Sequence, residues 1–356
     1  MSSNIKNFID KETNEKKNYY LTRMAQMHGW SCKVPSYQLK KILEKAGLIG
    51  LTEDCAINEI AGGKMIVTNV DIFTPIHDDP IIQGEITACN VTNDVFAKNV
   101  IEIISYLSFL GVPPQQPDEI TQGIIEGQRK FLKQFNSEIN GGHTIVNPWP
   151  LTGGIALGIC NKNDLIPKQI DKNASYGDLI ITKPLGIQAS MAAYRVMNEH
   201  PEFLEEFDTT LIKEIINVGV KIMRTSNYYV PKTIHENNIR EYIVGMTDIT
   251  GFGIKIHSEE MIEQRKIDIE LDTFPIIINT DKLSNLFGYG LLEGISAETA
   301  GPMLIAIDTS KVDTQTIQDI LKRNNIPSWK VGTFKKGTGN VRIMKDLNVI
   351  HVETYP

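Results

Sequence analysis

The stretch that decides the fold is CNVTNDVFAKN, residues 89–99, which places Asp94 among apolar and small side chains. The surrounding segment, residues 84–112, has a helical pattern, and we expect that helix to be interrupted near residues 92–94. The β-rich segment KMIVTNVDIFTP (64–75) precedes it and also carries a single aspartate. Together the two segments predict a strand followed by a helical region, each with one aspartate among apolar neighbours.

Strand and helix signals alternate on both sides of this stretch, which indicates an α/β (α+β) fold in two domains. The predicted helices are residues 36–48, 117–136, 187–200, 209–224 and 314–326; the predicted strands lie within 143–160, 179–187, 240–263, 303–308, 328–334 and 341–346. The polar segment 161–178 is the best domain boundary. We expect a mobile N-terminal arm at 1–36, an N-terminal domain at 37–165 and a C-terminal α/β domain at 170–356.

Composition and charge place the chain among ordinary globular proteins. Of its 356 residues, 41% are hydrophobic and 22% are charged. The formal net charge of −7 disfavours a general nucleic-acid binder, which usually carries a basic excess. None of the four cysteines forms a CxxC pair, so free thiols in a reducing compartment are expected. Because there is no signal-peptide pattern and no apolar run of about 18 residues, we expect a cytoplasmic protein with no membrane partner.

Isolated aspartates beside strand ends and glycines are the clearest chemical feature. Asp54 lies in LTEDCAI, Asp71 in TNVDIFTP, Asp94 in the opening stretch and Asp248 in GMTDITGFG. A carboxylate among apolar residues is costly to bury unless it is paired or bound to a cation. Four such groups from separate segments are suited to Mg²⁺, which prefers oxygen ligands and shares them with phosphates. The alternative for each is an N-cap or an Asx-turn.

Two other segments are candidates for contacts with phosphate. In NGGHTIVNP (140–148), adjacent glycines would let the backbone approach a ligand at Gly142, His143 and Thr144, although the same pattern fits a hairpin turn. In HGWSCKVP (28–35), Lys33 is suited to a lid over anionic phosphates, and its alternative is a solvated lysine. The histidines form no zinc motif.

These segments, in this order, resemble the selenophosphate synthetases, or selenide, water dikinases, of the aminoimidazole ribonucleotide synthetase-like superfamily. The resemblance covers about residues 25–310. It rests on the strings GWSCK, TEDCA, TNVDIFTPI, CNVTNDVFAKN, GGHT, ITKPLGI and MTDITGFG. It implies two α/β domains, an N-terminal sheet that pairs with its twin in a homodimer, and conversion of ATP, selenide and water to selenophosphate, AMP and phosphate.

The resemblance also implies a role for individual residues. Asp54, Asp94 and Asp248 would be Mg²⁺ ligands, and Lys33 would be the essential lysine of the arm. Further contacts to ATP would come from Leu51, Thr52, Glu53, Asp71, Asp94, Gly142, His143 and Thr144. Asn90 matches an asparagine of the family pattern.

The chain departs from the family pattern at one decisive position. The family has Gly-Cys-Gly-Cys-Lys in the arm, with the first Cys or a selenocysteine in the catalytic role. Aligned on Lys33, this chain has Trp30 at that position and keeps only Cys32. An indole cannot act as a nucleophile or selenium carrier. The first hypothesis is selenophosphate synthesis, with Cys32 as a stand-in or with no thiol needed, and the second is a paralogue that uses ATP but has another acceptor or a regulatory role. A third is a different enzyme of the same superfamily, and a fourth, an inactive homodimer kept for partner binding, is disfavoured by the retained carboxylates and Lys33.

Overall fold

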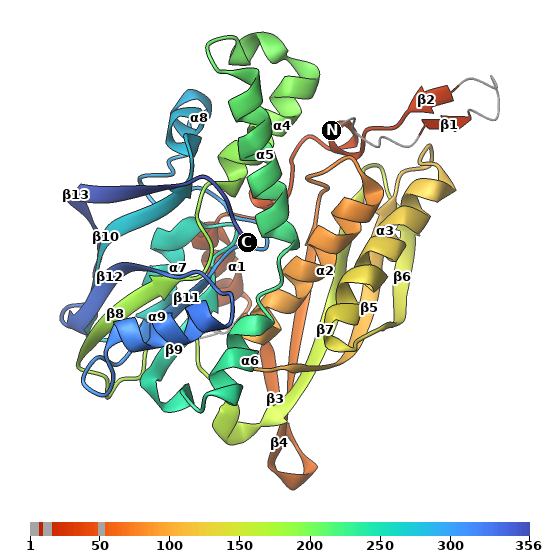
Figure 1. Cartoon of the computed structure of the whole chain (residues 1–356). Helices are drawn as coiled ribbons and strands as arrows, with labels where there is room; N and C mark the ends of the chain where they lie inside the picture. The colour runs from red at the N-terminus through yellow and green to blue at the C-terminus, as the bar shows by residue number, and fades with distance from the viewer. Residues whose placement is uncertain (1–6, 10–15, 49–53) are drawn as a thin grey trace.

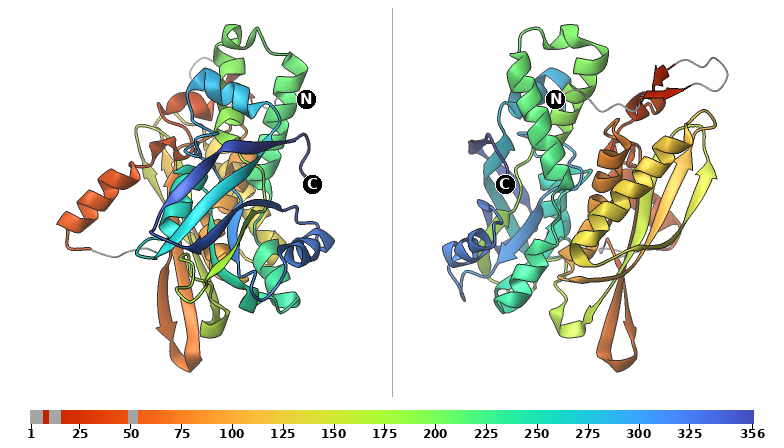
Figure 2. Two further views of the ribbon diagram at one scale, coloured as in Figure 1. Left: turned by 90° about the vertical axis from the view of Figure 1, so that its left-hand side faces the viewer. Right: turned by 45° about the vertical axis from the view of Figure 1, so that its right-hand side comes forward.

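A five-stranded mixed sheet forms the first half of the fold, in the computed structural model that describes residues 7–9, 16–48 and 54–356 (Figure 1). The strand order is β3-β4-β7-β5-β6. The strands are β3 (Ala56–Ile60), β4 (Lys64–Phe73), β5 (Glu102–Val112), β6 (Ile139–Val146) and β7 (Leu151–Asn161). Within this sheet β5 and β6 pair in parallel, and the other described neighbours pair antiparallel. Helices α2 (Pro80–Ala97) and α3 (Asp118–Leu132) cover one face of this sheet, and its other face has no cover within the described chain (Figure 2).

A six-stranded sheet forms the second half, with the order β13-β10-β12-β8-β11-β9. Its strands are β8 (Tyr176–Ile181), β9 (Ile243–Asp248), β10 (Ile267–Ile277), β11 (Met303–Ile307), β12 (Trp329–Lys336) and β13 (Val341–Val352). The helices of this half are α4 (Ile187–Glu199), α5 (Thr209–Arg224), α6 (Tyr229–Glu236), α7 (Gly253–Met261), α8 (Thr280–Phe287) and α9 (Thr314–Arg323). Mixed sheets with covering helices confirm the predicted α/β class. Among the described residues, no helix is both long and apolar enough to cross a membrane.

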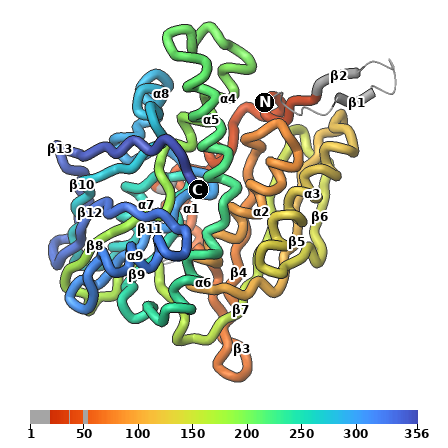
Figure 3. Tube along the Cα trace, in the orientation of Figure 1, coloured from red at the N-terminus to blue at the C-terminus, as the bar shows by residue number. Residues whose placement is uncertain are grey.

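Helix α2 lies at the centre of the molecule, between the two sheets (Figure 3). It contacts α3, β4 and β7 on one side and α5, α6 and β9 on the other, so nearly all of its side chains are buried. The helix begins at an N-cap, Asp79, whose carboxylate accepts from Ile81 N and Ile82 N at 2.9 and 3.1 Å. Residues carried on α2 are therefore held rigidly between the two halves.

The predicted interruption of this helix at residues 92–94 is wrong. The helix continues to Ala97, and Thr92 satisfies its hydroxyl inside the helix by donating to Ala88 O at 2.8 Å. The chain turns only at Asn99, which has a left-handed φ of 63°, and then enters β5. Burial on both sides of α2 outweighs the low helix propensity of Thr, Asn and Asp.

A close crossing of α2 and α3 depends on two glycines. A Cβ at Gly84 would lie 2.0 Å from Ile124 O, and a Cβ at Gly127 would lie 2.1 Å from Ile81 O. Both neighbours are backbone atoms, so they cannot move aside as a flexible side chain would. The small residues thus set the distance between the helices, and with it the position of α2.

We expect Gly84→Ala to lower the free energy of unfolding by about 1–3 kcal/mol, the usual cost of overpacking. Urea-induced unfolding checks this value. The control is Gly141→Ala, where the new Cβ meets only the flexible Leu107 Cδ2, at 3.3 Å. Equal stability of the two variants would contradict the close-packing argument.

The N-terminal segment packs against both halves of the fold. A short ribbon of β1 (Asn7–Ile9) and β2 (Lys16–Asn18) precedes it, and one solvent-exposed helix, α1 (Ser36–Lys45), follows it. Between them, Thr22 donates to Asp78 Oδ1 from N and Oγ1, both at 2.8 Å, and Arg23 Nη2 donates to Asn198 O at 3.1 Å. In this structure residues 19–33 therefore lie against the body; their mobility stays a prediction.

Most other predicted elements are present, with shifted ends. The predicted helix 36–48 corresponds to α1, 117–136 to α3, and the strand pair in 143–160 to β6 and β7. The elements that the sequence did not predict are β1, β2, β3, β10, α6 and α8, and residues 102–112, which were predicted as helix, form the strand β5 instead. The hairpin-turn alternative for NGGHTIVNP (140–148) is wrong for residues 142–144, because they lie inside β6.

Candidate functional site

Four aspartates from separate segments meet where α2 approaches β9. Asp71 lies on β4, Asp94 on the last turns of α2, Asp248 at the end of β9, and Asp54 just before β3. Desolvation, and then the charge of Asp94, raise the pKa of Asp71 and Asp248 well above the ordinary value. Desolvation, and then the charge of Asp54, raise the pKa of Asp94. Since the charge of Asp54 acts on Asp94, and that of Asp94 acts on Asp71 and Asp248, the tertiary structure brings together the four aspartates predicted from sequence. None of the four is the N-cap of a described helix, so the N-cap part of the alternative is wrong.

Asp71 is oriented by two asparagines. Asn90 Nδ2 donates to Asp71 Oδ2 at 2.9 Å, and Asn69 Nδ2 donates to the same oxygen at 3.2 Å. Asn90 precedes Asp94 by four residues on α2, so both side chains lie on one face of the helix. The spacing of Asn90 and Asp94 in the sequence therefore places an amide and a carboxylate side by side at the site.

Trp30 completes this hydrogen-bond chain from the N-terminal segment. Its indole Nε1 donates to Asn90 Oδ1 at 2.8 Å, and the ring stacks on Phe73 with centroids 5.5 Å apart. Only 8% of Trp30 is exposed. The preceding residue, Gly29, has a left-handed φ of 52°, which glycine adopts readily. It forms an isolated β-bridge with Thr74, just after β4, and this pairing brings Trp30 to the site. Trp30 thus occupies its position as an integral part of the site, with no thiol present there.

Lys33 lies between two aromatic rings beside the aspartates. Its Nζ is 5.0 Å from the Trp30 ring centroid and 4.4 Å from that of Phe252. Its charge opposes the upward pKa shifts of Asp71 and Asp94. Lys33 is therefore a cation at the aspartate cluster, and the alternative of a freely solvated lysine is wrong. Phe252 belongs to the MTDITGFG segment, and sequence reasoning did not identify its ring as part of the site.

Asp54 forms an ion pair with a lysine that sequence reasoning missed. Lys168 Nζ lies 2.9 and 2.7 Å from the two Asp54 oxygens and 2.7 Å from Glu260 Oε2. Desolvation raises the pKa of Asp54, but the charges of Lys168 and Lys98 outweigh it and lower the pKa overall. Lys168 follows a proline in the polar segment interpreted as a linker, and nothing in the local sequence indicates burial.

The TKPLG segment, which follows β8 in the second half of the fold, supports the same site through hydrogen bonds. Lys183 is 1% exposed, and its Nζ donates to Thr225 O at 2.7 Å and to Ala300 O at 2.8 Å. Desolvation lowers the pKa of this lysine. Ala300 N in turn donates to Asn90 Oδ1 at 2.9 Å. This motif therefore fixes the loop that supports Asn90.

The aspartate cluster fits a divalent cation in its chemistry. Its donors are carboxylate oxygens, the ligands that Mg²⁺ prefers. Asp248 Oδ2 is buried without a hydrogen-bond partner, although its carboxyl group hydrogen bonds to Asp94. In the described part of the chain, no three His, Cys, Asp or Glu side chains are already arranged closely enough to hold a metal.

The remaining predicted site residues lie apart or outside the description. Leu51, Thr52 and Glu53 fall outside the described residues. Gly142, His143 and Thr144 lie on the edge strand β6, three strands from Asp71 on β4, a separation of roughly 14 Å. Cys32 is a half-buried free thiol, and the other three cysteines are free and buried.

Comparisons with known proteins cover nearly the whole chain. The family described as AIR synthase related protein, N-terminal domain, matches residues 52–160, and its C-terminal domain matches residues 177–345. A relative named selenide, water dikinase from Methanocaldococcus jannaschii is 38% identical over 351 residues, covering 93% of this chain and 97% of that protein. One of the same name from Methanococcus maripaludis is 38% identical and covers 92% and 100%.

Solved structures share the fold at low sequence identity. Thiamine monophosphate kinase from Aquifex aeolicus has a TM-score of 0.64 at 13% identity, covering 88% of this chain and 98% of that one. The hydrogenase maturation protein HypE from E. coli has a TM-score of 0.58 at 15% identity, covering 86% and 93%. These matches confirm the two-domain architecture predicted from the resemblance. Because two relatives of that name are 38% identical over most of the chain, this protein belongs to the selenide, water dikinase family.

Proposed function

We propose that this protein is an ATP-dependent phosphotransferase that converts ATP, selenide and water to selenophosphate, AMP and phosphate. The observation that carries the proposal is the convergence of Asp54, Asp71, Asp94 and Asp248 beside Lys33. The names of its 38%-identical relatives supply the reaction. Phosphoryl transfer needs a cation-rich, positioned site more than covalent chemistry from the protein, and this arrangement offers such a site.

In this proposal Asp54, Asp94 and Asp248 hold Mg²⁺, and Asp71 lies beside the nucleotide. When bound, Mg²⁺ would neutralise the triphosphate and the carboxylates together. Lys33 binds phosphate oxygens and, with Trp30 and Phe252 around it, keeps water away from them. The buried Asp248 Oδ2 without a partner supports a cation at this point.

A homodimer is part of the proposal because one face of the five-stranded sheet is apolar and uncovered. The pairing register places Val70, Ile155 and Leu107 in one row across the sheet, and Ile72 and Phe109 in the next. Val70 is 58% exposed and Ile72 is 36% exposed. An exposed apolar surface of this kind is typical of a protein interface, and a second copy of the same sheet would cover it.

The dimer also gives a role to residues 142–144. His143 is paired with Phe109 and lies in the same row as Ile72, on the uncovered face. Residues on β6 are too far along the sheet to reach a nucleotide at Asp71 of their own chain. We therefore propose that Gly142, His143 and Thr144 contact the ATP held by the other copy.

Trp30 at the thiol position favours direct transfer to free selenide. In that step selenide attacks the γ-phosphorus, the bond to the bridging oxygen breaks, and ADP leaves before water cleaves it to AMP and phosphate. No enzyme thiol is required as a carrier. The buried, hydrogen-bonded indole supports this because it fills the position completely and offers no nucleophile.

The test is an anaerobic incubation of the protein with ATP, Mg²⁺ and selenide under reducing conditions, followed by phosphorus NMR. Selenophosphate together with AMP is the expected result. Turnover of ATP without selenophosphate would support the alternative of a paralogue with another acceptor. Neither turnover nor nucleotide binding would refute both.

We expect Cys32→Ser to retain selenophosphate formation within about threefold, a change of less than 1 kcal/mol in the barrier. Cys32 packs against the core from the turn Trp30–Cys32, and a hydroxyl is close to it in size. The NMR assay above measures the rate, with wild type as reference. Complete loss of selenophosphate with ATP turnover intact would show instead that Cys32 carries selenium.

A further inference from the structure

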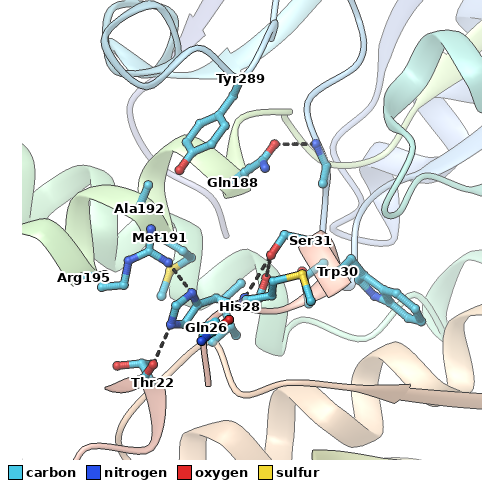
Figure 4. Close-up of a pocket in the computed structure, with 14 residues that line it drawn as sticks. Thr22, Gln26, His28, Trp30, Ser31, Gln188, Met191, Ala192, Arg195 and Tyr289 are labelled. Atoms are coloured by element: carbon cyan, nitrogen blue, oxygen red, sulfur yellow. Dashed lines mark hydrogen bonds between the residues drawn. The ribbon is translucent and has the colours of Figure 1, made fainter. Parts of the chain in front are cut away.

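A cavity that is partly open to solvent lies next to Trp30, and none of the four aspartates lines it (Figure 4). It has a volume of about 160 Å³ and separates the N-terminal segment from α4. Its walls include Thr22, His28, Trp30, Gln188, Arg195 and Tyr289. Sites for ligands of drug or nucleotide size occupy about 300–1,000 Å³. The cavity therefore has room for a small ion with a few waters, and is too small for ATP.

Arg195 brings an uncompensated positive charge to this cavity. Its Nη1 donates to His28 Nδ1, and His28 Nε2 then bears the proton and donates to Thr22 O. Because Nδ1 accepts from Arg195, the imidazole is neutral in this arrangement, and desolvation, and then the charge of Arg195, lower the pKa of His28 in the same direction. Among the described residues, no carboxylate lies within ion-pair distance of Arg195. The guanidinium thus has one neutral partner and four further N–H donors.

The nearby carboxylates are already engaged elsewhere. Glu199, one turn further along α4, pairs with Arg23 at 3.4 Å. Asp78 accepts from both donors of Thr22 at 2.8 Å and from the Tyr194 hydroxyl at 2.9 Å. Both lie close enough to His28 to affect its pKa, yet neither neutralises Arg195. The charge that faces the cavity is therefore positive.

The opposite wall offers hydrogen-bond donors. Gln188 Oε1 accepts from Ala297 N at 2.8 Å and from Ser296 Oγ at 3.1 Å, which fixes the amide and leaves its Nε2 without a partner among the described residues. The Tyr289 hydroxyl points toward Gln188 and α4 (Figure 4). An arginine fork, an amide and a phenol that converge on one small space suit a tetrahedral oxyanion.

We propose that this cavity binds a small oxyanion of the size of inorganic phosphate, with Arg195 and Gln188 as its main ligands. The site is distinct from the aspartate cluster and does not depend on which acceptor the enzyme uses. Because His28 and Trp30 come from the N-terminal segment while Arg195 and Gln188 come from α4, the anion joins the two. Its binding therefore stabilises the packed position of the segment that carries Lys33.

The test is calorimetric titration of the full-length protein with inorganic phosphate, without nucleotide or Mg²⁺ and at constant ionic strength. Wild type is expected to bind saturably with one site per chain. Arg195→Gln is expected to weaken binding about tenfold to a hundredfold, as for loss of a charged hydrogen-bond partner. Arg129→Gln is the matched control, since Arg129 is an exposed arginine on α3 that does not line the cavity, and its affinity should change less than about twofold.

Two further variants separate a ligand role from a folding defect and from the nucleotide site. Gln188→Glu keeps the oxygen that accepts from Ala297 N but adds a negative charge, so it should abolish phosphate binding with an unchanged melting temperature. Lys33→Ala should bind phosphate within about threefold of wild type, because Lys33 belongs to the aspartate cluster. AMP, which presents the same chemistry on a larger molecule, should not compete.

Three results would overturn the proposal. They are the absence of saturable binding to wild type, equal affinity in folded Arg195→Gln or Gln188→Glu, and loss of binding in Lys33→Ala, which would place the ion at the nucleotide site. The selenophosphate assay is run separately without these variants. Failure of phosphate binding therefore leaves the proposed function standing, and failure of that assay leaves the oxyanion site standing.

Discussion

Asp94→Asn is expected to lower ATP turnover by about a hundredfold to a thousandfold, the usual cost of removing one preorganised charged group from an active site. Asp94 is 8% exposed at the centre of the cluster and is coupled to Asp54, Asp71 and Asp248. An amide of the same size keeps the packing of α2 but is a weak ligand for Mg²⁺. Turnover is measured as release of AMP and phosphate at saturating ATP and Mg²⁺.

The stability of this variant separates a functional from a structural role. Without metal, Asp94→Asn should melt at the same temperature as wild type or higher, because one of four mutually repelling buried carboxylates is gone. Wild type should gain stability on addition of Mg²⁺ and a non-hydrolysable nucleotide, and the variant should gain much less. Asp319→Asn, an exposed position on α9, is the control and should behave as wild type. Full turnover in folded Asp94→Asn would refute the proposed metal site.

Substitution of Trp30 is the second change with a large expected effect. Trp30→Phe keeps the stacking on Phe73 but leaves Asn90 Oδ1 without the indole donor, so we expect turnover to fall about tenfold, in line with the loss of one buried hydrogen bond. Trp30→Ala removes the ring as well. It should cost about 3–5 kcal/mol of stability, because it empties a buried aromatic site, and it should also remove one wall around Lys33.

Trp30→Cys distinguishes an anchoring role from a missing catalytic thiol. This change restores the side chain that the family pattern has at this position, but it also removes the support of Asn90 and Lys33. We therefore expect less selenophosphate than with wild type in the NMR assay, together with a lower melting temperature. A rate above wild type would show that the thiol, when present, matters more than the indole, and would refute direct transfer to free selenide.

Local patterns were sufficient for most of the fold. The apolar runs and turn residues predicted β4, α3, α4, α5 and α9 from the sequence, because their amphipathic periods report directly on which face is buried. The interruption of α2 was predicted wrongly because this helix has no amphipathic period from which its buried face could be identified. A helix buried on both sides has no polar face, and its Thr, Asn and Asp residues are stabilised by partners that lie far away in the sequence.

Sequence motifs were sufficient to identify several residues of the candidate site, but not to predict which of them contact one another. Asp71, Asp94 and Asp248 stood out because a lone carboxylate among apolar residues demands an explanation. Lys168 did not, because a lysine in a polar segment looks solvated, and only the fold brings it within 2.7 Å of Asp54. Residues 142–144 resembled a phosphate loop, and the sheet register places them on an edge strand instead.

The sequence by itself determined the family, the α/β class and the residue types available for metal and phosphate, because these depend on short-range pattern and chemistry. The tertiary structure decided what Trp30 does. Its ring is stacked on Phe73 and hydrogen bonded to Asn90, sixty residues away, and it borders a cavity whose cation comes from α4. Such roles arise from contacts between segments that are distant in the chain, and a local sequence pattern does not show which distant segments will be in contact.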